Sequence, residues 1–486
     1  MSILTENTRL TTTELIAMIL KIIKEAKDSI ESEKKLFHFF KNLGCELLQS
    51  ALEILDKELY EKVYKKCGYK VERIDERTVY CLFGELTYKR RLLKKEGAKS
   101  IYPLDHKMGF EARKHYSLGT MALIVKAMAK TTARNASEMI QDLAHITVSH
   151  QTVVSIKNCV GRRIRDYEEK KADEAPEAKE TVESGIIAIE GDGIVMKGKE
   201  GGKKEELHRI QIYTGIKKNG NRTELTGSHY FEGLDRKALV RRVTHFIQNH
   251  YDLANLTVLS NGDGGAGYQF SDFDDMVAGC KIHHHFRDLY HVNKKIRTRL
   301  SFCPREFVDT MVRDLFDVIH NMRPWLDTAL SLAKTGKDIE QVSKLEAYIE
   351  RNKAYIPTLK QRGIKTNIHL GTAETNHRYY SYRLKRQGRV WSHSGLDYMA
   401  AVLTALKTGE LDEALMYRER GKSYKQKDRA MNTAARGALK AVYSTLSASQ
   451  KRRVKSYRPG CVDGRIACYG ASTAPMAQFA KAIQNY

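Results

Sequence analysis

Three acidic residues have the chemistry and the surroundings that a divalent-metal site requires. Asp192 and Asp263 each close a short apolar run that predicts a buried strand, in IIAIEGDGIVM and LTVLSNGDGG. Glu374 begins a segment of helical character, GTAETNHRYYSYRL, for which Thr372 is the expected N-cap. Carboxylates that meet from two strand ends and a helix can hold two divalent cations. Such a pair of cations activates water and stabilises the leaving oxygen in phosphodiester cleavage.

An Asp beside Gly is also a common turn residue, so the order of the neighbouring elements matters. The strand of Asp192 is followed by two strand-like runs, HRIQIYTGI and TELTGSHYFEGL, joined by the turn-prone KKNGNR. The amphipathic segment DRKALVRRVTHFIQNHYD then precedes the strand of Asp263. Three strands, a helix and a strand, with acids on the first and fourth strands, predict a ribonuclease-H-like nuclease core. Glu190, two residues before Asp192, is expected to face away from the metals and to tolerate substitution.

Several motifs of this chain resemble those of the ISLre-type bacterial insertion-sequence transposases, within the Mutator-like class of DDE transposases. They are IEGDGI, SNGDGGAGY, CKIHHHF, TAETNHRYYSYRL, GRVWSHSGLDYM, FGELTYKRRLL and SEMIQDLAHITVSHQTV. The resemblance implies that Asp192, Asp263 and Glu374 are both the catalytic triad and the metal ligands, with two Mg²⁺ or Mn²⁺ ions as cofactors. It also implies a helical insertion within the 111 residues that separate Glu374 from Asp263.

The implied activity is that of a DDE transposase, which cuts the transposon end and joins the freed 3′-hydroxyl to target DNA. Two other functions stay open: a domesticated, catalytically silent DNA-binding regulator, and a ribonuclease-H-like nuclease that does not join ends. The expected partners are double-stranded DNA, as transposon ends and as target, and further copies of the chain in a homodimer or higher oligomer on DNA.

Cys280 and His283 have the spacing of metal ligands, and a zinc site is one interpretation. Zinc needs about four ligands, and no matching pair lies nearby in the sequence. In the resembled class, a Cys or Asp, two intervening residues and a His follow the second Asp. Cys280 and His283 are therefore expected to support the core beside the site.

Residues 135–164 predict two short helices, ASEMIQDLA and HQTVVSIKNCVGRRI, joined by the turn HITVS, with Ser149 as the N-cap of the second. A helix-turn-helix presents its second helix to the major groove of DNA. The side chains expected to face the DNA are His150, Gln151, Thr152, Ser155 and Lys157. An ordinary helical hairpin has the same pattern, so both interpretations stay open, and the resemblance favours DNA.

The charge of the chain agrees with a nucleic-acid partner. Lys and Arg total 83 against 59 Asp and Glu, which gives a net charge of +24. Solubility alone is the alternative reason for such a surface. The segment from Arg378 to Arg458 holds 19 basic and 6 acidic residues and flanks the suspected carboxylate site. It is expected to contact DNA, with Arg378, Arg383 and Arg386 as candidates.

The expected fold is a multidomain α/β protein with a helical DNA-binding N-terminal part, a small β-hairpin, a ribonuclease-H-like core interrupted by an α-helical insertion, and a helical, basic C-terminal tail. The expected regions are an N-terminal helical region (1–68), a β-hairpin region (69–103), a helix-turn-helix-like DNA-binding region (104–164), an acidic linker (165–184), the first part of the core (185–300), the insertion (301–370), the second part of the core with Glu374 (371–400) and the basic C-terminal region (401–486).

The remaining features concern the compartment and one aromatic residue. No run of about 18 uncharged apolar residues predicts a membrane span, and the N-terminus does not resemble a signal peptide. The 8 cysteines are scattered, which favours a reducing compartment over a disulfide framework. The expected location is cytoplasmic, associated with the nucleoid and away from membranes. Trp325 lies among apolar residues at helical spacing, which is more typical of a core than of a wedge that stacks on a flipped base.

Overall fold

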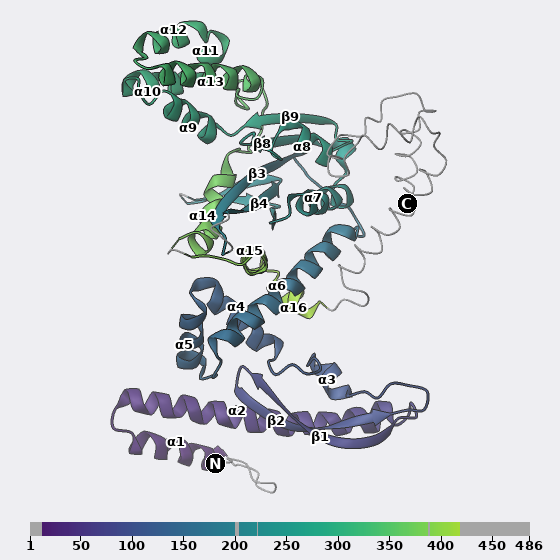
Figure 1. The fold of residues 1–486 in the computed structure, drawn as a ribbon. Helices are drawn as coiled ribbons and strands as arrows, with labels where there is room; N and C mark the ends of the chain where they lie inside the picture. The colour runs from purple at the N-terminus through teal and green to yellow at the C-terminus, as the bar shows by residue number, and fades with distance from the viewer. Residues whose placement is uncertain (1–11, 200–203, 221, 387–388, 418–486) are drawn as a thin grey trace, which may run out of the picture. The chain divides into compact units, whose positions relative to one another are not determined.

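The N-terminal part is a pair of helices followed by a β-hairpin (Figure 1). The computed structural model describes residues 12–199, 204–220, 222–386 and 389–417. The first elements are α1 (Thr12–Glu25), α2 (Ser29–Leu59), a π-helical turn (Tyr60–Tyr64), β1 (Lys70–Cys81), β2 (Gly84–Lys94) and α3 (Pro103–Met108). Leu52 of α2 is buried against Val79 and Leu86 of the two strands. The helices and the hairpin expected in this part of the sequence are therefore present.

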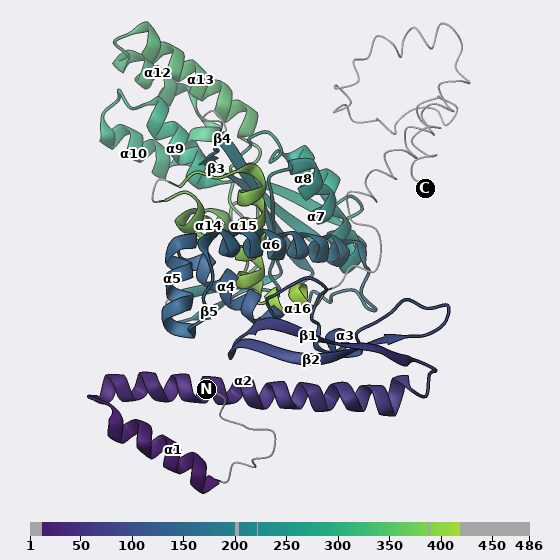
Figure 2. The same ribbon diagram turned by 60° about the horizontal axis from the view of Figure 1, so that its bottom comes forward.

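Three helices connect the hairpin to the central sheet: α4 (Leu118–Lys130), α5 (Ala133–Ala144) and α6 (His150–Asp173). The Ser149 hydroxyl accepts a hydrogen bond from the Thr152 amide at 3.1 Å, which confirms Ser149 as the N-cap of α6. Helix α6 packs against α4 and α5 and also against helices of the core (Figure 2). Arg165 of α6 pairs with Glu232 and Asp397, each at 2.8 Å.

A five-stranded mixed sheet forms the centre of the described residues. Its strands are β3 (Ile186–Lys197), β4 (Lys204–Tyr213), β7 (His229–Gly233), β8 (Thr257–Gly262) and β9 (Ile282–Arg287), in the order β7-β4-β3-β8-β9. The first three pair antiparallel, and β3, β8 and β9 run parallel. The turn-prone segment KKNGNR forms a separate hairpin of β5 (Gly215–Asn219) and β6 (Arg222–Thr226).

Helices cover this sheet and extend beyond it (Figure 1). The amphipathic segment after β7 is α7 (Arg236–His250), whose N-cap Asp235 accepts from the amides of Lys237 and Ala238. Apolar residues of α7 form one core with β3, β4 and β8. The other helices of this part are α8 (Phe270–Met276), α14 (Thr372–Leu384), α15 (His393–Thr408) and α16 (Leu411–Met416).

An all-helical segment lies between β9 and α14. It consists of α9 (Leu289–Arg299), α10 (Arg305–Arg313), α11 (Leu315–His320), α12 (Arg323–Leu332) and α13 (Gly336–Asn352) and has its own apolar core. The expected insertion is therefore present, but it begins at Leu289 instead of residue 301. Trp325 packs against this core and contacts Phe307 with ring centroids 5.6 Å apart, in agreement with a structural role.

The expected linker at residues 165–184 is wrong in its first half. Helix α6 continues through Asp173, and Arg165 is held by carboxylates of β7 and α15. The acidic residues here are partners of buried arginines, as in the contact of Glu168 with Arg242 at 3.3 Å. The expected boundary at residue 400 also falls inside α15, and the rest of the basic tail, from residue 418, lies outside the described residues. None of the helices in the described ranges combines the length and apolar character needed to cross a bilayer.

Candidate active site

The acidic residues meet at one end of the parallel strands because those strands are in register. Gly191 of β3 pairs with Gly262 of β8, and Gly262 pairs with Arg287 of β9. The residues that follow these three are Asp192, Asp263 and Asp288. Glycine is needed at 191, because a Cβ there would lie 2.7 Å from the Tyr268 ring. Asp192 does not end its strand as expected, because β3 continues to Lys197 and pairs there with β4.

Asp192, Glu374 and His377 form a group that can hold a metal ion. One ligand atom of each lies within 4.8 Å of the others. The Asp192 Oδ2 atom is 3.4 Å from His377 Nδ1, and the same nitrogen is 3.6 Å from Glu374 Oε2. Asp192 and His377 are buried, and Glu374 is exposed in the first turn of α14. A carboxylate pair of this kind suits Mg²⁺ or Mn²⁺, so the residues fit one divalent ion.

Protonation states in this group follow from burial and neighbouring charge. Burial acts to raise the pKa of Asp192, but the nearby His291 and the hydrogen bond from the Gly193 amide hold it below its usual range. Burial next to Arg209 lowers the pKa of His377 to about 4, so this imidazole is neutral at pH 7. Burial and the charge of Asp192 raise the pKa of Glu374. An added cation would therefore relieve repulsion between the two carboxylates.

Asp263 is the third expected carboxylate, and it does not join this group. Its Oδ1 atom accepts a hydrogen bond from the Gly265 amide at 2.7 Å, and its side chain lines a cavity of about 590 Å³ with Arg287. The structure therefore brings together two of the three expected acids and places the third directly after the adjacent strand β8.

Three neighbouring residues were not expected from the sequence. Asp288 is the buried N-cap of α9, and His291 on the same helix lies 3.7 Å from Asp192. The strand before them, β9, could not be recognised in the sequence, because IHHHFR lacks the alternation of apolar residues that predicts a strand. His377 had a visible signal, since Glu374 and His377 are three residues apart and share one helix face, a spacing found at metal sites in helices.

Glu190 is the side chain that holds the N-terminus of α14 in place. It is fully buried, and its two oxygens each accept three hydrogen bonds. The donors are the Tyr213 and Thr372 hydroxyls, the Asn261 amide group and the backbone amides of Gly371, Thr372 and Ala373. Burial raises the pKa of Glu190, and the hydrogen bonds oppose that rise.

Glu190 therefore corrects two expectations. Glu190 does not face away from the site, because residues two apart on a strand share one face and Glu190 lies on the face of Asp192. Its six hydrogen bonds predict that substitution there is not tolerated. The N-cap of α14 is Gly371 with φ 88°, and Thr372 is the first helical residue. The capping acceptor comes from β3, 181 residues earlier than Gly371, where it offsets the positive end of the helix.

The residues expected to read DNA are divided between surface and interior. His150, Gln151 and Ser155 are exposed on α6 and Thr152 is half-buried, so a role in binding stays a prediction for these four. Lys157 is wrong as a groove contact. It is buried, with 2% of its surface exposed, and its Nζ donates to the Gly395 carbonyl at 2.9 Å.

The basic residues of α14 and its C-terminal end divide in the same way. Arg378 and Arg386 are exposed, and their contact with DNA stays a prediction. Arg383 is buried, donates to the Met128 carbonyl at 3.0 Å and lies over the Trp391 ring, so it holds α4 to the core instead of binding phosphate. Helix periodicity explains the difference, because Arg378 and Arg383 are five residues apart and point to different sides.

The role expected for Cys280 and His283 also stays a prediction. The two ring nitrogens of His283 lie 2.7 Å from the Ser260 hydroxyl and 2.8 Å from Asp274, which is the arrangement of a residue that holds β8, β9 and α8 together. The Cys280 thiol is partly buried, and burial raises its pKa.

Comparison with a known solved structure adds a weak likeness. The Drosophila P element transposase strand transfer complex aligns with 63% of this chain and 82% of that chain, at 9% identity and a TM-score of 0.23. A score of this size supports no argument about the fold.

Comparison with sequences identifies the family. A UPF0236 protein from the vanSb 3′ region of Streptococcus gallolyticus is 33% identical over 399 residues, covering 81% of this chain and 86% of the relative. A UPF0236 protein of Caldanaerobacter subterraneus subsp. tengcongensis, whose name joins eleven locus designations, is 22% identical over 406 residues and 82% of each chain. The family model for the uncharacterised protein family UPF0236 matches residues 23–421, and the chain belongs to this family.

Proposed function

We propose that this protein is a DDE transposase of the ISLre type, which cuts DNA at transposon ends and joins the cut strand to target DNA. The observation that carries the proposal is the meeting of Asp192 on β3 with Glu374 on α14, at the end of the sheet where Asp263 follows β8. These acids are far apart in the sequence, and the fold brings them together at one site. Their proximity does not stabilise the folded protein, so it requires another explanation. Like charges placed together raise the energy of the folded state unless a cation or substrate binds there.

The sheet supports a ribonuclease-H-like core for this proposal. Along the chain, the first acid lies on the first strand of the sheet, β3, and the second acid follows the fourth, β8. The antiparallel strands β4 and β7 and then α7 lie between them. This is the order that the sequence predicted for a nuclease core. The all-helical segment from α9 to α13 stands between the second and third acids, as the resemblance implies.

The relatives and the charge supply independent support. A name that covers eleven loci of one genome fits a gene that has been copied within that genome, which is the behaviour of a mobile element. The net charge of +24 suits a protein that works on DNA.

The chain's own residues account for the arrangement of the reaction. Bound divalent cations would activate the attacking water or 3′-hydroxyl and neutralise the charge of the leaving oxygen. Asp192 and Glu374 would hold one cation, with Asp263 turned to share the second. Glu190 fixes the helix that carries Glu374. Exposed Arg378, one turn beyond Glu374, would contact a phosphate of the bound strand.

The test is metal-dependent cleavage and joining with DNA that carries the sequences flanking the coding region. Asp192→Asn, Asp263→Asn and Glu374→Gln should each lose nicking and strand joining in Mg²⁺ and Mn²⁺ by orders of magnitude, because an amide is a much weaker ligand for these hard cations. DNA binding should stay unchanged or become tighter, since each substitution removes a negative charge near phosphate.

A matched control is Asp275→Asn, which removes an exposed carboxylate of α8 and should leave cleavage unchanged. Wild-type protein that binds the ends but never cuts with either metal would contradict the proposal and favour the silent DNA-binding regulator. Cleavage without joining would favour the nuclease.

A further inference from the structure

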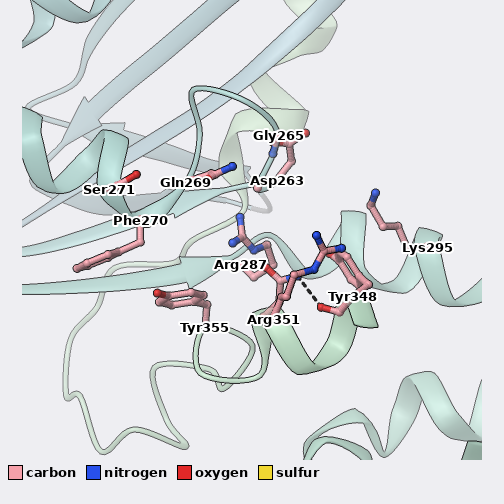
Figure 3. Close-up of a pocket in the computed structure, with 12 residues that line it drawn as sticks. Asp263, Gly265, Gln269, Phe270, Ser271, Arg287, Lys295, Tyr348, Arg351 and Tyr355 are labelled. Atoms are coloured by element: carbon pink, nitrogen blue, oxygen red, sulfur yellow. Dashed lines mark hydrogen bonds between the residues drawn. The ribbon is translucent and has the colours of Figure 1, made fainter. Parts of the chain in front are cut away.

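A cavity of about 590 Å³ lies beside Asp263, between the sheet and the helical insertion (Figure 3). Its volume falls within the range of about 300–1,000 Å³ that small-molecule sites have. Arg287, Lys295 and Arg351 line it and supply three positive charges, and Asp263 is its one carboxylate among the described residues. The cavity is therefore suited to an anionic group.

Arg287 is the feature that points to a ligand. Only 5% of its surface is exposed, and its Nε atom has no hydrogen-bond partner among the described residues. Its guanidinium donates one long hydrogen bond, from Nη1 to the Gly262 carbonyl at 3.4 Å, and lies 5.6 Å from the centre of the Tyr355 ring. It forms no ion pair with a carboxylate of the described chain. A buried guanidinium is costly unless an anion accompanies it, and the planar group matches a phosphate.

Aromatic rings form another wall of the same cavity. Phe270 and Tyr355 lie together on one side of Arg287 in Figure 3, with ring centroids 5.9 Å apart and planes 17° from parallel. Phe270 is 36% exposed, which is unusual for a large apolar side chain beside a core. An anion site with flat apolar rings beside it matches a nucleotide, which has a phosphate and a planar base.

The surroundings favour a nucleotide within a DNA strand. Lys295 of α9 also lines a second cavity of about 470 Å³, together with His291, Lys294, Arg299 and Lys344. His291 contacts Asp192 in the candidate active site. Positive side chains therefore lead from the catalytic carboxylates along α9 to the cavity, as a bound polynucleotide backbone would require.

We propose that this cavity binds one unpaired nucleotide of the DNA strand that is cut, next to the scissile phosphate. Arg287 and Arg351 hold its phosphate, and its base stacks on the rings of Phe270 and Tyr355. The inference rests on the proposed function, because the carboxylates beside the cavity are those assigned to cleavage.

The experiment measures DNA binding without cleavage, so that its result does not depend on catalysis. Fluorescence anisotropy in EDTA compares a blunt duplex with the same duplex carrying a short single-stranded tail. Wild-type protein should bind the tailed duplex about tenfold more tightly, since one stacked base contributes on this scale. Phe270→Ala and Arg351→Ala should each reduce that preference severalfold and leave binding of the blunt duplex unchanged.

Matched controls test the specificity of the effect. Phe40→Ala removes an exposed aromatic of α2, and Arg305→Ala removes an exposed arginine of α10 that lines neither cavity. Both variants should keep the preference for the tail. Phe270 and Arg351 are themselves exposed, so their variants should fold, and thermal unfolding will verify this. A bromouracil in the tail, irradiated in the complex, should crosslink to Phe270 or Tyr355.

Three results would overturn the proposal: no preference of the wild type for the tail, equal losses on both duplexes, or a crosslink far from the cavity. Thymidine monophosphate at the concentration of the DNA should not displace the tail. Displacement at that concentration would mean that the cavity serves free nucleotides, and the proposal would fail. Failure of the proposed function shows separately, as absence of cleavage in Mg²⁺ while the tail preference in EDTA remains.

Discussion

Two buried charged side chains at the same end of the sheet differ in the number of hydrogen bonds that they make with the rest of the chain. Glu190 on β3 has six donors around its two oxygens. Arg287 on β9 has one long hydrogen bond and an Nε atom without a partner among the described residues. Both are at least 95% buried, so each is removed from water to a similar degree.

This difference indicates that Glu190 has a structural role in the site, whereas Arg287 is available to bind a ligand. Burial of a charge costs free energy unless hydrogen bonds or an opposite charge offset it. The carboxylate of Glu190 receives that compensation within the chain, from three backbone amides at the start of α14. Within the described residues, the guanidinium of Arg287 has one long hydrogen bond and a contact with the Tyr355 ring, so a bound anion would supply the compensation that the proposed nucleotide site requires.

The largest expected effect follows from Glu190→Gln. The two side chains have the same shape, but either orientation of the amide places an NH₂ group against three donors. We expect DNA cleavage to fall by orders of magnitude, because α14 would no longer hold Glu374 in position. We also expect the free energy of unfolding to fall by about 2–4 kcal/mol, since buried donors lose their acceptor.

Glu183→Gln is the matched control, because Glu183 is exposed just before β3. Cleavage assays and urea unfolding will measure both variants. Glu190→Asp keeps the charge with a shorter reach and should recover part of the cleavage activity. Wild-type cleavage in Glu190→Gln would show that Glu190 does not position the helix.

The second effect concerns Arg287→Met, for which stability and binding should move in opposite directions. Replacing an uncompensated buried charge with an apolar side chain of similar volume should leave the free energy of unfolding unchanged or raise it by about 1–2 kcal/mol. Binding of the tailed duplex should weaken about tenfold, because a charged hydrogen bond to phosphate is lost.

Arg165→Met gives the contrast, because Arg165 is paired with Glu232 and Asp397. Its loss should lower the free energy of unfolding by about 3–5 kcal/mol, since buried carboxylates are left without a partner. If Arg287→Met unfolds as easily as Arg165→Met, Arg287 has a structural role and the comparison with Glu190 fails.

Much of the fold could be predicted from the sequence, because apolar periodicity and capping residues act locally. The strand of Asp263, helix α7 and the hairpin β1–β2 have patterns that burial alone requires. Strand β9 could not be found in this way. Three of its six residues are histidine, and the Ser260 hydroxyl of the neighbouring strand β8 lies within hydrogen-bond distance of one ring nitrogen each of His283 and His285.

The site was predicted in part for the same physical reason. Asp192 lies on a recognisable strand, Asp263 directly follows another, and Glu374 lies at the start of a recognisable helix, so the sequence indicates them. The roles of Glu190 and Lys157 depend on partners 181 and 238 residues away, which no local pattern shows. From local patterns, Arg165 is likewise assigned to an acidic linker, because its partners on β7 and α15 are distant in the sequence.

Lys157 has an effect that appears only as the pH is raised, and its number of hydrogen-bond partners lies closer to that of Arg287 than to that of Glu190. It is a buried cation with one hydrogen bond, to the Gly395 carbonyl at 2.9 Å. Burial lowers the pKa of Lys157 to about 8, and the charge of Asp397 on α15 opposes that change. In the unfolded chain, a lysine keeps its proton to about pH 10.4. Between these values the unfolded state binds more protons, so the folded state gains stability as the pH rises.

The measurement is urea unfolding of wild type and Lys157→Met across pH 7 to pH 10. The buried charge has its full destabilising effect below about pH 8. As the pH rises through this window, the free energy of unfolding of the wild type should therefore increase by up to about 3 kcal/mol relative to that of the variant. Lys126→Met, at an exposed position of α4, should run parallel to the wild type. Parallel curves for Lys157→Met as well would mean that one hydrogen bond and Asp397 compensate the charge fully. Lys157 would then belong with Glu190, and burial with few partners would no longer mark Arg287 as a ligand-binding residue.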